Sequence, residues 1–478
     1  MKASKYLGIF CLAAALPVTA GAQNTGALTT EDCYLKGLSD KAECFTLQVP
    51  ENPAEPSGTL LTLHAARLPA LTPSELPPLA VLAGGPGQSA IEIGGGVGKV
   101  FHELLADRDI IFLEQRGTGN SNGIKCASED DDPYEDLYSD AESEKLVAQC
   151  LADFEGDLSH YNTPNAIHDF AAMVRALGYP KVHLYGGSYG SRAALVFMRL
   201  YPDMIASTVL DGMAPVQVVV GPFARHGQRA LELLFDECET TPSCQQRYPN
   251  LRRDYWQLWA AIKQRNVIAD IYHPTTLAPH KLRLDGTKFF QLTLSYLYSQ
   301  EQRQLLPFAI DAAAKGHWQP FAGLIAAGGD NGMYTGLTTN ILCNEDMRRA
   351  STDQLAADSQ SMFGDASIRL LHAMCAHWPG RYQLDKTHFE PVTSAIPTLA
   401  LSGNLDPVTP PAWGDSTVTH LSNATHIVAE QAAHIVAMRG CGPKLVRQFL
   451  NDPSAPLEKT DCLADLPSVT FMRSNNAH

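Results

Sequence analysis

The segment Gly186-Gly-Ser-Tyr-Gly190 constrains this chain more than any other part of its sequence. It has the pattern G-x-S-x-G, follows the β-strand-like run 182–185, and precedes apolar residues at helical spacing. A serine in that place lies on a strained turn between a strand and a helix. The flanking glycines remove Cβ atoms that would clash, and the helix N-terminus faces any negative charge that develops there. The sequence therefore predicts that Ser188 is a nucleophile at the end of a buried strand.

A nucleophilic serine needs a base to take its proton and an acid to orient that base. In folds with this turn, the chain order is serine, acid, histidine. Asp406 follows the apolar run 398–401 and is the expected acid, with Asp211, which also follows a strand, as its rival. His434 lies in a loop between the last expected strand and a helix, and is the expected base. Four other histidines are expected to be packed or solvated side chains: His183, His372, His377 and His426.

Acyl transfer also needs two backbone N–H groups that bind the oxygen of the tetrahedral intermediate. One is expected from Tyr189, directly after the nucleophile. The other is expected from Gly85, in the loop Ala83-Gly-Gly-Pro-Gly87 that follows the apolar run 79–82. A plain glycine turn is the alternative interpretation of this loop.

Short apolar runs bounded by Gly, Pro and Asp alternate with helical patterns along the chain. The expected strands are 79–82, 110–113, 182–185, 208–210, 398–401 and 426–428. A helix is expected over 163–178, with Thr163 as N-cap, Pro164 in the first turn, and Ile167, Phe170, Val174 and Leu177 on one face. The alternation predicts an α/β fold, a mostly parallel sheet with helices on both faces.

Residues 213–390 interrupt this rhythm and read as largely helical. Insertions above the carboxyl ends of strands cover the crevice where α/β proteins bind ligands. We therefore expect a helical cap over 213–390, with the core in two parts, 23–212 and 391–478.

Residues 1–22 are the expected export signal, with Lys2 and Lys5, a short apolar run, and a cleavage site at Ala20-Gly-Ala22. The run is shorter than the about 20 residues that span a bilayer, so we expect a secreted or periplasmic protein. Of the 11 cysteines, Cys11 leaves with the signal, and an even number remains for an oxidising compartment. One hypothesis pairs them in sequential order: Cys33 with Cys44, Cys126 with Cys150, Cys238 with Cys244, Cys343 with Cys375, and Cys441 with Cys462.

Charge and motifs exclude several classes of function. Lys and Arg number 36 against 51 Asp and Glu, and no basic run supplies the positive stripe that nucleic-acid binding needs. The sequence has no C-x-x-C or H-E-x-x-H, so we expect no metal site. The segment Gly94-Gly-Gly-Val-Gly-Lys-Val100 resembles a phosphate loop but lacks its first glycine and its Ser or Thr. Asp130-Asp-Asp132 is expected to be a solvated loop rather than an amine or calcium site.

Four motifs in order resemble one family: Gly84-Gly-Pro-Gly87, Glu114-Gln-Arg-Gly-Thr-Gly-Asn-Ser121, Gly186-Gly-Ser-Tyr-Gly190 and Asp406-Pro-Val-Thr-Pro-Pro411. The chain is similar, over most of 33–462, to α/β-hydrolase serine peptidases of the prolyl iminopeptidase type, and above all to their secreted tripeptidyl aminopeptidase branch. The resemblance implies an α/β-hydrolase fold, a helical cap, no cofactor, and a serine exopeptidase acting on free N-termini. Ala83, Glu114 and Ala433 depart from the family, which has His, Asp and Gly there.

An aminopeptidase must bind an ammonium group, which calls for carboxylates in the cap. The family has a similar Cys-x-x-Asp segment there, so the resemblance implies that Glu345 and Asp346 bind substrate; a helix-capping acid pair is the alternative. The expected partner is a peptide with a free N-terminus, and we expect no nucleic acid, no membrane anchor and a monomeric protein. Two other functions stay open: an esterase or similar acyl hydrolase with the same triad, and a catalytically silent binding protein on this fold.

Overall fold

The computed structural model describes residues 26–126, 134–135, 140–327, 332–468 and 470–472. The expected export signal and Asp130-Asp-Asp132 lie outside these residues. In the described ranges the main sheet has nine strands, in the order β1-β2-β3-β5-β4-β6-β7-β10-β11. The strands are β1 (Thr29–Tyr34), β2 (Lys41–Pro50), β3 (Leu60–Leu68), β4 (Leu79–Leu82), β5 (Ile110–Leu113), β6 (Val182–Gly187), β7 (Ile205–Asp211), β10 (Thr398–Gly403) and β11 (Ala424–Ala429).

The sheet is mostly parallel. Strands β5, β4, β6, β7, β10 and β11 run in one direction, while β1, β2 and β3 form an antiparallel edge that joins at β5. Each of the six expected strands lies within one of the six parallel strands. The α/β-hydrolase fold predicted from the sequence is confirmed.

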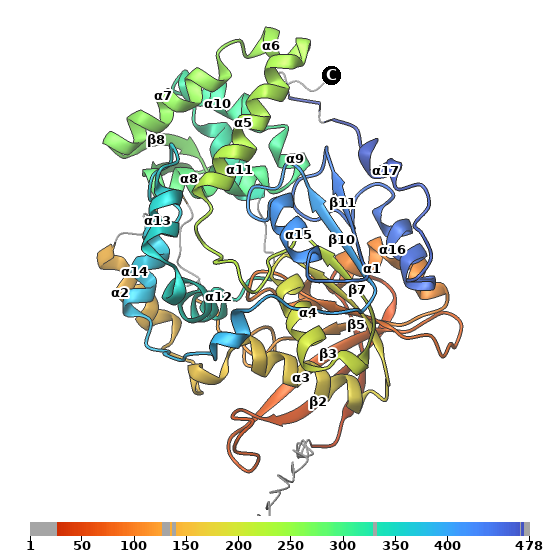
Figure 1. The fold of residues 1–478 in the computed structure, drawn as a ribbon. Coiled ribbons are helices and arrows are strands. Elements are labelled where there is room, and N and C mark those ends of the chain that lie inside the picture. The colour runs from red at the N-terminus through yellow and green to blue at the C-terminus, as the bar shows by residue number, and fades with distance from the viewer. Residues whose placement is uncertain (1–25, 127–133, 136–139, 328–331, 469, 473–478) are drawn as a thin grey trace, which may run out of the picture.

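Helices cover both faces of this sheet (Figure 1). They are α1 (Ala90–Val100), α3 (Thr163–Ala176), α4 (Tyr189–Leu200), α15 (Pro411–Val418), α16 (Gly442–Asn451) and α17 (Asp461–Ala464), whereas α2 (Asp140–Cys150) lies beside α14 (Arg369–His377). Successive residues of β4 point to opposite faces, so Ala80 and Leu82 pack in the hydrophobic cluster of α3 and α4. Leu79 and Val81 pack instead with α1 and α16. None of the helices in the described residues is long and apolar enough to cross a lipid bilayer.

The chain leaves the sheet after β7 and returns to it at β10. Between them lie α5 (Ala224–Thr240), α6 (Pro242–Arg247), α7 (Leu251–Gln264), α8 (Gly286–Leu297), α9 (Gln300–Arg303), α10 (Leu306–Ala314), α11 (Gln319–Ala327), α12 (Thr335–Ile341), the π-helical turn η4 (Leu342–Asp346), α13 (Thr352–Ser359) and α14 (Arg369–His377). A hairpin of β8 (Val267–Tyr272) and β9 (Pro279–Leu284) adds strands to a segment expected to be largely helical. Many of these helices stand above the sheet in Figure 1, around a hydrophobic cluster of their own.

Two local features differ from expectation. The N-cap of α3 is Asn162, whose side chain accepts from the backbone N–H of Asn165, so Thr163 is already the first helical residue. The glycine-rich segment 94–100 is part of helix α1 and not a loop. A Cβ on Gly95 would lie 2.0 Å from the carbonyl oxygen of Lys36, so glycine is what allows α1 to pack there.

Ten cysteines of the described residues form disulfides in the sequential order that the sequence analysis favours. Cys343–Cys375 joins η4 to α14, and Cys238–Cys244 joins α5 to α6. Disulfides of this number are typical of proteins that fold in an oxidising compartment.

Candidate active site

The candidate catalytic residues follow the carboxyl ends of parallel strands. Ser188 follows β6, Asp406 follows β10, and His434 follows β11. Because β6, β7, β10 and β11 are neighbours in the sheet and run in parallel, their carboxyl ends meet at one edge. This edge is where open α/β sheets bind their ligands.

Ser188 occupies a strained turn. Its φ is 57° and its ψ is −126°, a conformation that residues other than glycine rarely adopt. A Cβ on Gly186 would lie 2.2 Å from the carbonyl oxygen of Gly190, and one on Gly190 would lie 2.2 Å from that of Leu82. The outer glycines of the motif therefore allow the sharp turn and the close packing of α4 on β4, as the sequence predicts.

The loop 83–87 lies directly against Ser188. A Cβ on Gly84 would lie 3.2 Å from the Cβ of Ser188, so this glycine permits the approach. In the described structure, the backbone N–H groups of Gly85 and Tyr189 have no hydrogen-bond acceptor. An oxyanion hole requires two such N–H groups, and the assignment of Gly85 and Tyr189 to it stays a prediction.

Asp406 and His434 form a buried acid–base pair. The Nδ1 atom of His434 lies 2.7 Å from Oδ2 of Asp406. The other contacts of Asp406 fix its carboxylate: it accepts from the N–H of Val408 at 2.9 Å, and from the N–H and Oγ1 of Thr409 at 2.8 and 2.6 Å. Oγ1 of Thr409 also lies 3.1 Å from Nδ1 of His434. Nδ1 of the imidazole is therefore held by two oxygen atoms, Oδ2 of Asp406 and Oγ1 of Thr409, whose positions the turn after β10 sets.

This pair alters the proton affinity of both members. Burial by itself raises the pKa of Asp406, but the charge of His434 and the hydrogen bonds from His434 and Thr409 outweigh burial and hold that pKa below its usual value. Burial lowers the pKa of His434, but the charge and hydrogen bond of Asp406 bring it above its usual value. Asp406 is thus ionised at neutral pH, and it stabilises a proton on His434.

Asp211, the rival acid, has a different place. Its carboxylate does not contact the imidazole; it accepts from the backbone N–H groups of Val436 and Ala437, both at 2.8 Å. Its backbone oxygen accepts from the N–H of Ser188 at 2.8 Å. A Cβ on the next residue, Gly212, would lie 3.1 Å from Cε1 of His434. The peptide 211–212 therefore lies between the turn at Ser188 and the loop at His434.

The segment between β7 and β10 contacts both sides of this site. On one side, the carbonyl oxygen of Tyr298 accepts from the N–H of His434 at 3.2 Å, and the two rings meet edge to face with centroids 5.0 Å apart. On the other side, the N–H of Tyr334 donates to the carbonyl oxygen of Gly87 at 2.7 Å. A Cβ on Gly85 would lie 3.2 Å from Cε of Met333. The inserted segment thus borders the imidazole and the oxyanion loop.

The two acids expected to bind an ammonium group are buried. Asp346 receives the guanidinium of Arg192, with Nη1 3.1 and 2.9 Å from its two oxygens, and also that of Arg349. Glu345 accepts from the N–H and Oγ1 of Thr163 at 2.8 and 2.7 Å and from the hydroxyl of Tyr382 at 3.0 Å. The charge of Asp346 is matched by arginine, whereas the hydrogen-bond donors to Glu345 are neutral.

Glu345 is linked to the residue that follows the nucleophile. Oγ1 of Thr163 lies 2.6 Å from the hydroxyl of Tyr189 and 2.7 Å from Oε2 of Glu345. His388 is 3.9 Å from Glu345, but burial lowers the pKa of His388 to about 3, so it is neutral at physiological pH. Burial also raises the pKa of Glu345 itself.

Of the four histidines expected to be packed or solvated, His183 and His426 contact polar side chains, and His372 and His377 are exposed. His183 contacts Ser207 at 2.7 Å, and His426 contacts Ser402 and Asp415, both at 3.0 Å. His372 and His377 line a surface pocket of about 520 Å³ beside α14.

Three residues of the site were not predicted from the sequence: Thr409, Arg192 and Tyr298. Thr409 could have been found from the sequence, because it stands three residues after Asp406 in an Asp-x-x-Thr turn. Arg192 could have been found as a charged residue in an apolar helix, whereas nothing in the sequence pointed to Tyr298.

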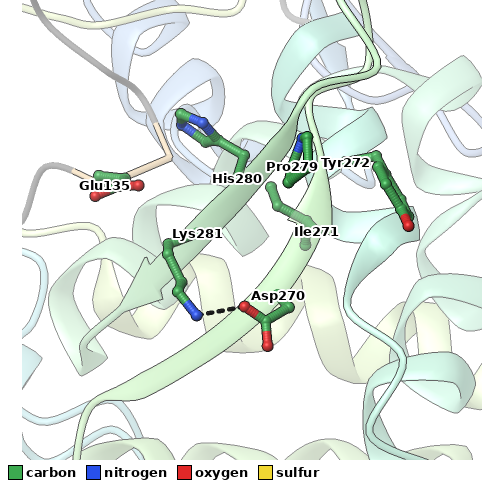
Figure 2. Close-up of a pocket in the computed structure, with 7 residues that line it drawn as sticks. All are labelled: Glu135, Asp270, Ile271, Tyr272, Pro279, His280 and Lys281. Atoms are coloured by element: carbon green, nitrogen blue, oxygen red, sulfur yellow. Dashed lines mark hydrogen bonds and ion pairs between the residues drawn. The ribbon is translucent and has the colours of Figure 1, made fainter.

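A second surface pocket, of about 350 Å³, lies on the hairpin of β8 and β9 (Figure 2). Its lining residues are Glu135, Asp270, Ile271, Tyr272, Pro279, His280 and Lys281. Figure 2 shows Lys281 bonded to Asp270 across the two strands. Ser188, Asp406 and His434 do not line this pocket, so it is separate from the candidate active site.

Comparison with known proteins supports the same interpretation. Residues 360–462, which include Asp406 and His434, match a family model described as TAP-like protein. Serine protease Hip1 of Mycobacterium tuberculosis is 30% identical over 186 residues, 36% of this chain and 36% of the relative. The chain resembles the TAP-like serine peptidases.

Two further relatives are aminopeptidases by name. The tripeptidyl aminopeptidase of Streptomyces lividans is 28% identical over 201 residues, 38% of this chain and 37% of the relative. The proline iminopeptidase of Aeromonas sobria is 30% identical over 146 residues, 30% of each chain. The match spans little more than a third of the length of the curated relatives. The resemblance predicted from the four motifs is confirmed: the chain has an α/β-hydrolase fold and is similar to serine peptidases.

Proposed function

We propose that the protein is an exported serine aminopeptidase that removes residues or short peptides from the free N-termini of peptides. The observations that support the proposal are the strained turn at Ser188 and the buried Asp406–His434 pair, which follow the carboxyl ends of parallel strands in one sheet. The names of the relatives supply the reaction class, since two of them are aminopeptidases.

In the proposed mechanism, Oγ of Ser188 attacks the carbonyl carbon of the scissile peptide bond while His434 takes the hydroxyl proton. The N–H groups of Gly85 and Tyr189 stabilise the oxyanion, and Asp406 stabilises the imidazolium. His434 then gives its proton to the leaving amine, which departs as the new N-terminus of the shortened peptide. Water, deprotonated by His434, hydrolyses the acyl-enzyme and returns Ser188 to its starting state.

In this proposal the cap, residues 213–390, is what restricts the enzyme to the ends of peptide chains. Tyr298 borders the imidazole and Met333 borders the oxyanion loop, so the cap flanks the nucleophile from both sides. A segment in that position limits access to chain ends, whereas an endopeptidase needs an open groove for a continuous chain.

The proposed ammonium partner is Glu345. Its hydrogen-bond donors are neutral, and it connects through Thr163 to Tyr189, the residue beside Ser188. A buried carboxylate without a matching cation is costly, and a substrate ammonium group would supply that cation. Asp346 is proposed to act only indirectly, because Arg192 already matches its charge.

Export is part of the proposal and rests on the predicted signal at residues 1–22. The disulfides of the described residues support it, because such bonds persist outside the reducing cytosol. Mass spectrometry of the protein recovered from the periplasm or the medium tests this part, and a mature chain beginning at Gln23 is expected.

The decisive experiment compares an alanyl-prolyl arylamide with a free amino terminus and the same compound with an acetylated one. Cleavage of the free compound alone, abolished in Ser188→Ala, is the expected result. Equal rates on the two compounds, or activity on simple esters alone, would instead indicate an esterase or a general acyl hydrolase. If a fluorophosphonate fails to label Ser188, the protein is a catalytically silent binding protein.

The role of Glu345 has its own test. Glu345→Gln should lower kcat/KM on the free arylamide by about 10- to 100-fold, the worth of a hydrogen bond to a charged group. Labelling of Ser188 by the fluorophosphonate should stay unchanged, because that reagent carries no ammonium group. A parallel loss of labelling would assign Glu345 to the structure of the site rather than to substrate binding.

A further inference from the structure

Asp211 is a buried carboxylate that the proposed mechanism does not use. It ends strand β7 and has no exposed surface. Its Oδ1 accepts from the N–H of Val436, and its Oδ2 accepts from the N–H of Ala437 and from the hydroxyl of Tyr185 at 3.1 Å. Both oxygens are therefore committed to the residues that follow His434 by two and three positions.

The turn held in this way has an unusual backbone. Ile435, between His434 and Val436, has a φ of 68°, in the left-handed region that β-branched residues seldom adopt. Such a conformation persists only where surrounding contacts impose it. The two hydrogen bonds to Asp211 come directly after Ile435 and fix the direction of the chain there.

The same residue also fixes the nucleophile. The backbone oxygen of Asp211 accepts from the N–H of Ser188 at 2.8 Å. In addition, Cδ1 of Ile435 lies 3.0 Å from where a Cβ on Gly187 would be, so the turn after the histidine packs on the turn before the serine. Asp211 thus joins the two loops whose separation determines whether His434 reaches Ser188.

We propose that Asp211 is a positioning residue, whose carboxylate holds the left-handed turn at Ile435 and thereby places the imidazole of His434 for proton transfer with Ser188. The inference rests on the proposed function, since it assigns a role within that mechanism. It adds a second acid to the site, one that acts on the backbone behind the histidine while Asp406 acts on the ring.

Charge supports this placement. The titratable groups that face Asp211 are Tyr185 on β6 and His434 on the loop after β11. Burial raises the pKa of Asp211 to about 6, and the hydrogen bonds from Val436, Ala437 and Tyr185 limit that rise. In return, the negative charge of Asp211 contributes to the raised pKa of His434, after the larger effects of burial and Asp406.

The test is Asp211→Asn, which keeps the size of the side chain but turns one acceptor oxygen into an NH₂ group that faces a backbone N–H. The matched control is Asp358→Asn in the inserted segment. Asp358 is buried and accepts from the N–H groups of Ala224 and Arg225 and from the hydroxyl of Ser367, at 3.2, 3.0 and 2.6 Å. The two carboxylates have the same set of bonds, but only Asp211 lies beside the site.

Rates are measured on the free arylamide and on a small aryl ester, per site titrated with fluorophosphonate. In Asp211→Asn, kcat should fall by about 10²-fold, the cost of a small misplacement of a catalytic group, with KM unchanged. The acid limb of kcat/KM should move to lower pH, since a charge that raises the pKa of His434 is gone. Asp358→Asn should change neither quantity, although both variants lose stability.

The outcomes separate this inference from the proposed function. If Asp211→Asn keeps the kcat and acid limb of the control, the inference is overturned while the mechanism stands. If the natural protein cleaves the ester but not the arylamide, the aminopeptidase proposal fails and the ester rates still decide the role of Asp211. If Ser188 is unreactive in the natural protein, both are overturned. Should Asp211→Asn not fold, Asp211→Ser, which keeps one acceptor oxygen, takes its place with the same criteria.

Discussion

The bond between Asp406 and His434 predicts how activity depends on pH. His434 must be neutral to accept the proton of Ser188, so kcat/KM rises as the pH passes upward through the pKa of His434. The charge and hydrogen bond of Asp406 outweigh the effect of burial and hold that pKa above its usual value. In Asp406→Asn, the acid limb should therefore move to lower pH, and kcat should fall by about 10⁴-fold. A pH–rate profile of the two proteins checks both effects; an acid limb that stays in place would contradict the pairing.

The second prediction concerns Asp346. Asp346→Asn leaves the buried guanidinium of Arg192 without its negatively charged partner, so the free energy of unfolding should fall by about 3–5 kcal/mol. Urea denaturation measures this loss. Asp365→Asn is the control, because it breaks an exposed pair with Arg369 and should cost less than about 1 kcal/mol. The preference for the free over the acetylated arylamide should survive in Asp346→Asn, and a loss of that preference would assign Asp346 to ammonium binding.

At the level of single residues, the sequence predicts roles that a local motif defines and misses contacts between residues that are far apart in the chain. Ser188 could be predicted because the flanking glycines and the strand before it are local. The sequence favoured Asp406 over Asp211 but could not show their contacts, since Asp211 ends a strand and Asp406 closely follows one; the difference is which atoms of the His434 loop each one meets. The environment of Asp346 was equally out of reach, because its partner Arg192 is 154 positions away.

At the level of elements, the end of α8 carries a testable role. Tyr298 follows α8. Its ring contacts the ring of His434 edge to face, and its backbone oxygen accepts from the backbone N–H of His434. Aromatic pairs contribute about 0.5–1.5 kcal/mol beyond burial, so Tyr298→Leu should lower kcat by about 2- to 12-fold. Tyr296→Leu, two residues earlier, removes a buried ring bonded to the carbonyl oxygen of Phe321 and should lower stability but not kcat. Steady-state kinetics and thermal unfolding of the two variants decide; equal kcat values would contradict a role for Tyr298.

The helices and strands also show which elements can be predicted from the pattern of apolar residues. The parallel strands β4, β5, β6 and β10 are short runs buried on both faces, and their largely apolar sequence identifies them. The antiparallel edge β1–β3 was missed, although Phe45, Leu47 and Val49 alternate with polar residues in β2, the pattern of a strand with one buried face. Helix α1 could not be predicted from propensity, because glycine disfavours helices, and close packing at Gly94, Gly95 and Gly98 is what requires it there.

For the whole molecule, the contribution of disulfides to the free energy of unfolding can be compared between two bridges in the same segment of the chain. Cys343–Cys375 closes 32 residues and Cys238–Cys244 closes 6, and both lie in the segment between β7 and β10. A cross-link stabilises mainly by restricting the unfolded chain, more so for a longer loop. Replacing the long pair by serines should lower the free energy of unfolding by about 4 kcal/mol, and replacing the short pair by about 2 kcal/mol.

Urea denaturation of the two serine variants, recorded by tryptophan fluorescence, tests this order. Because both bridges belong to the same segment, differences between the inserted segment and the sheet affect the two measurements alike. A larger loss from the short pair would contradict the chain-entropy account. Contacts of the folded segment, rather than loop length, would then determine how much each disulfide stabilises the protein. The Cys238–Cys244 bridge lies at the end of α5, and Arg229 of the same helix donates to Asn404, near the turn of Asp406.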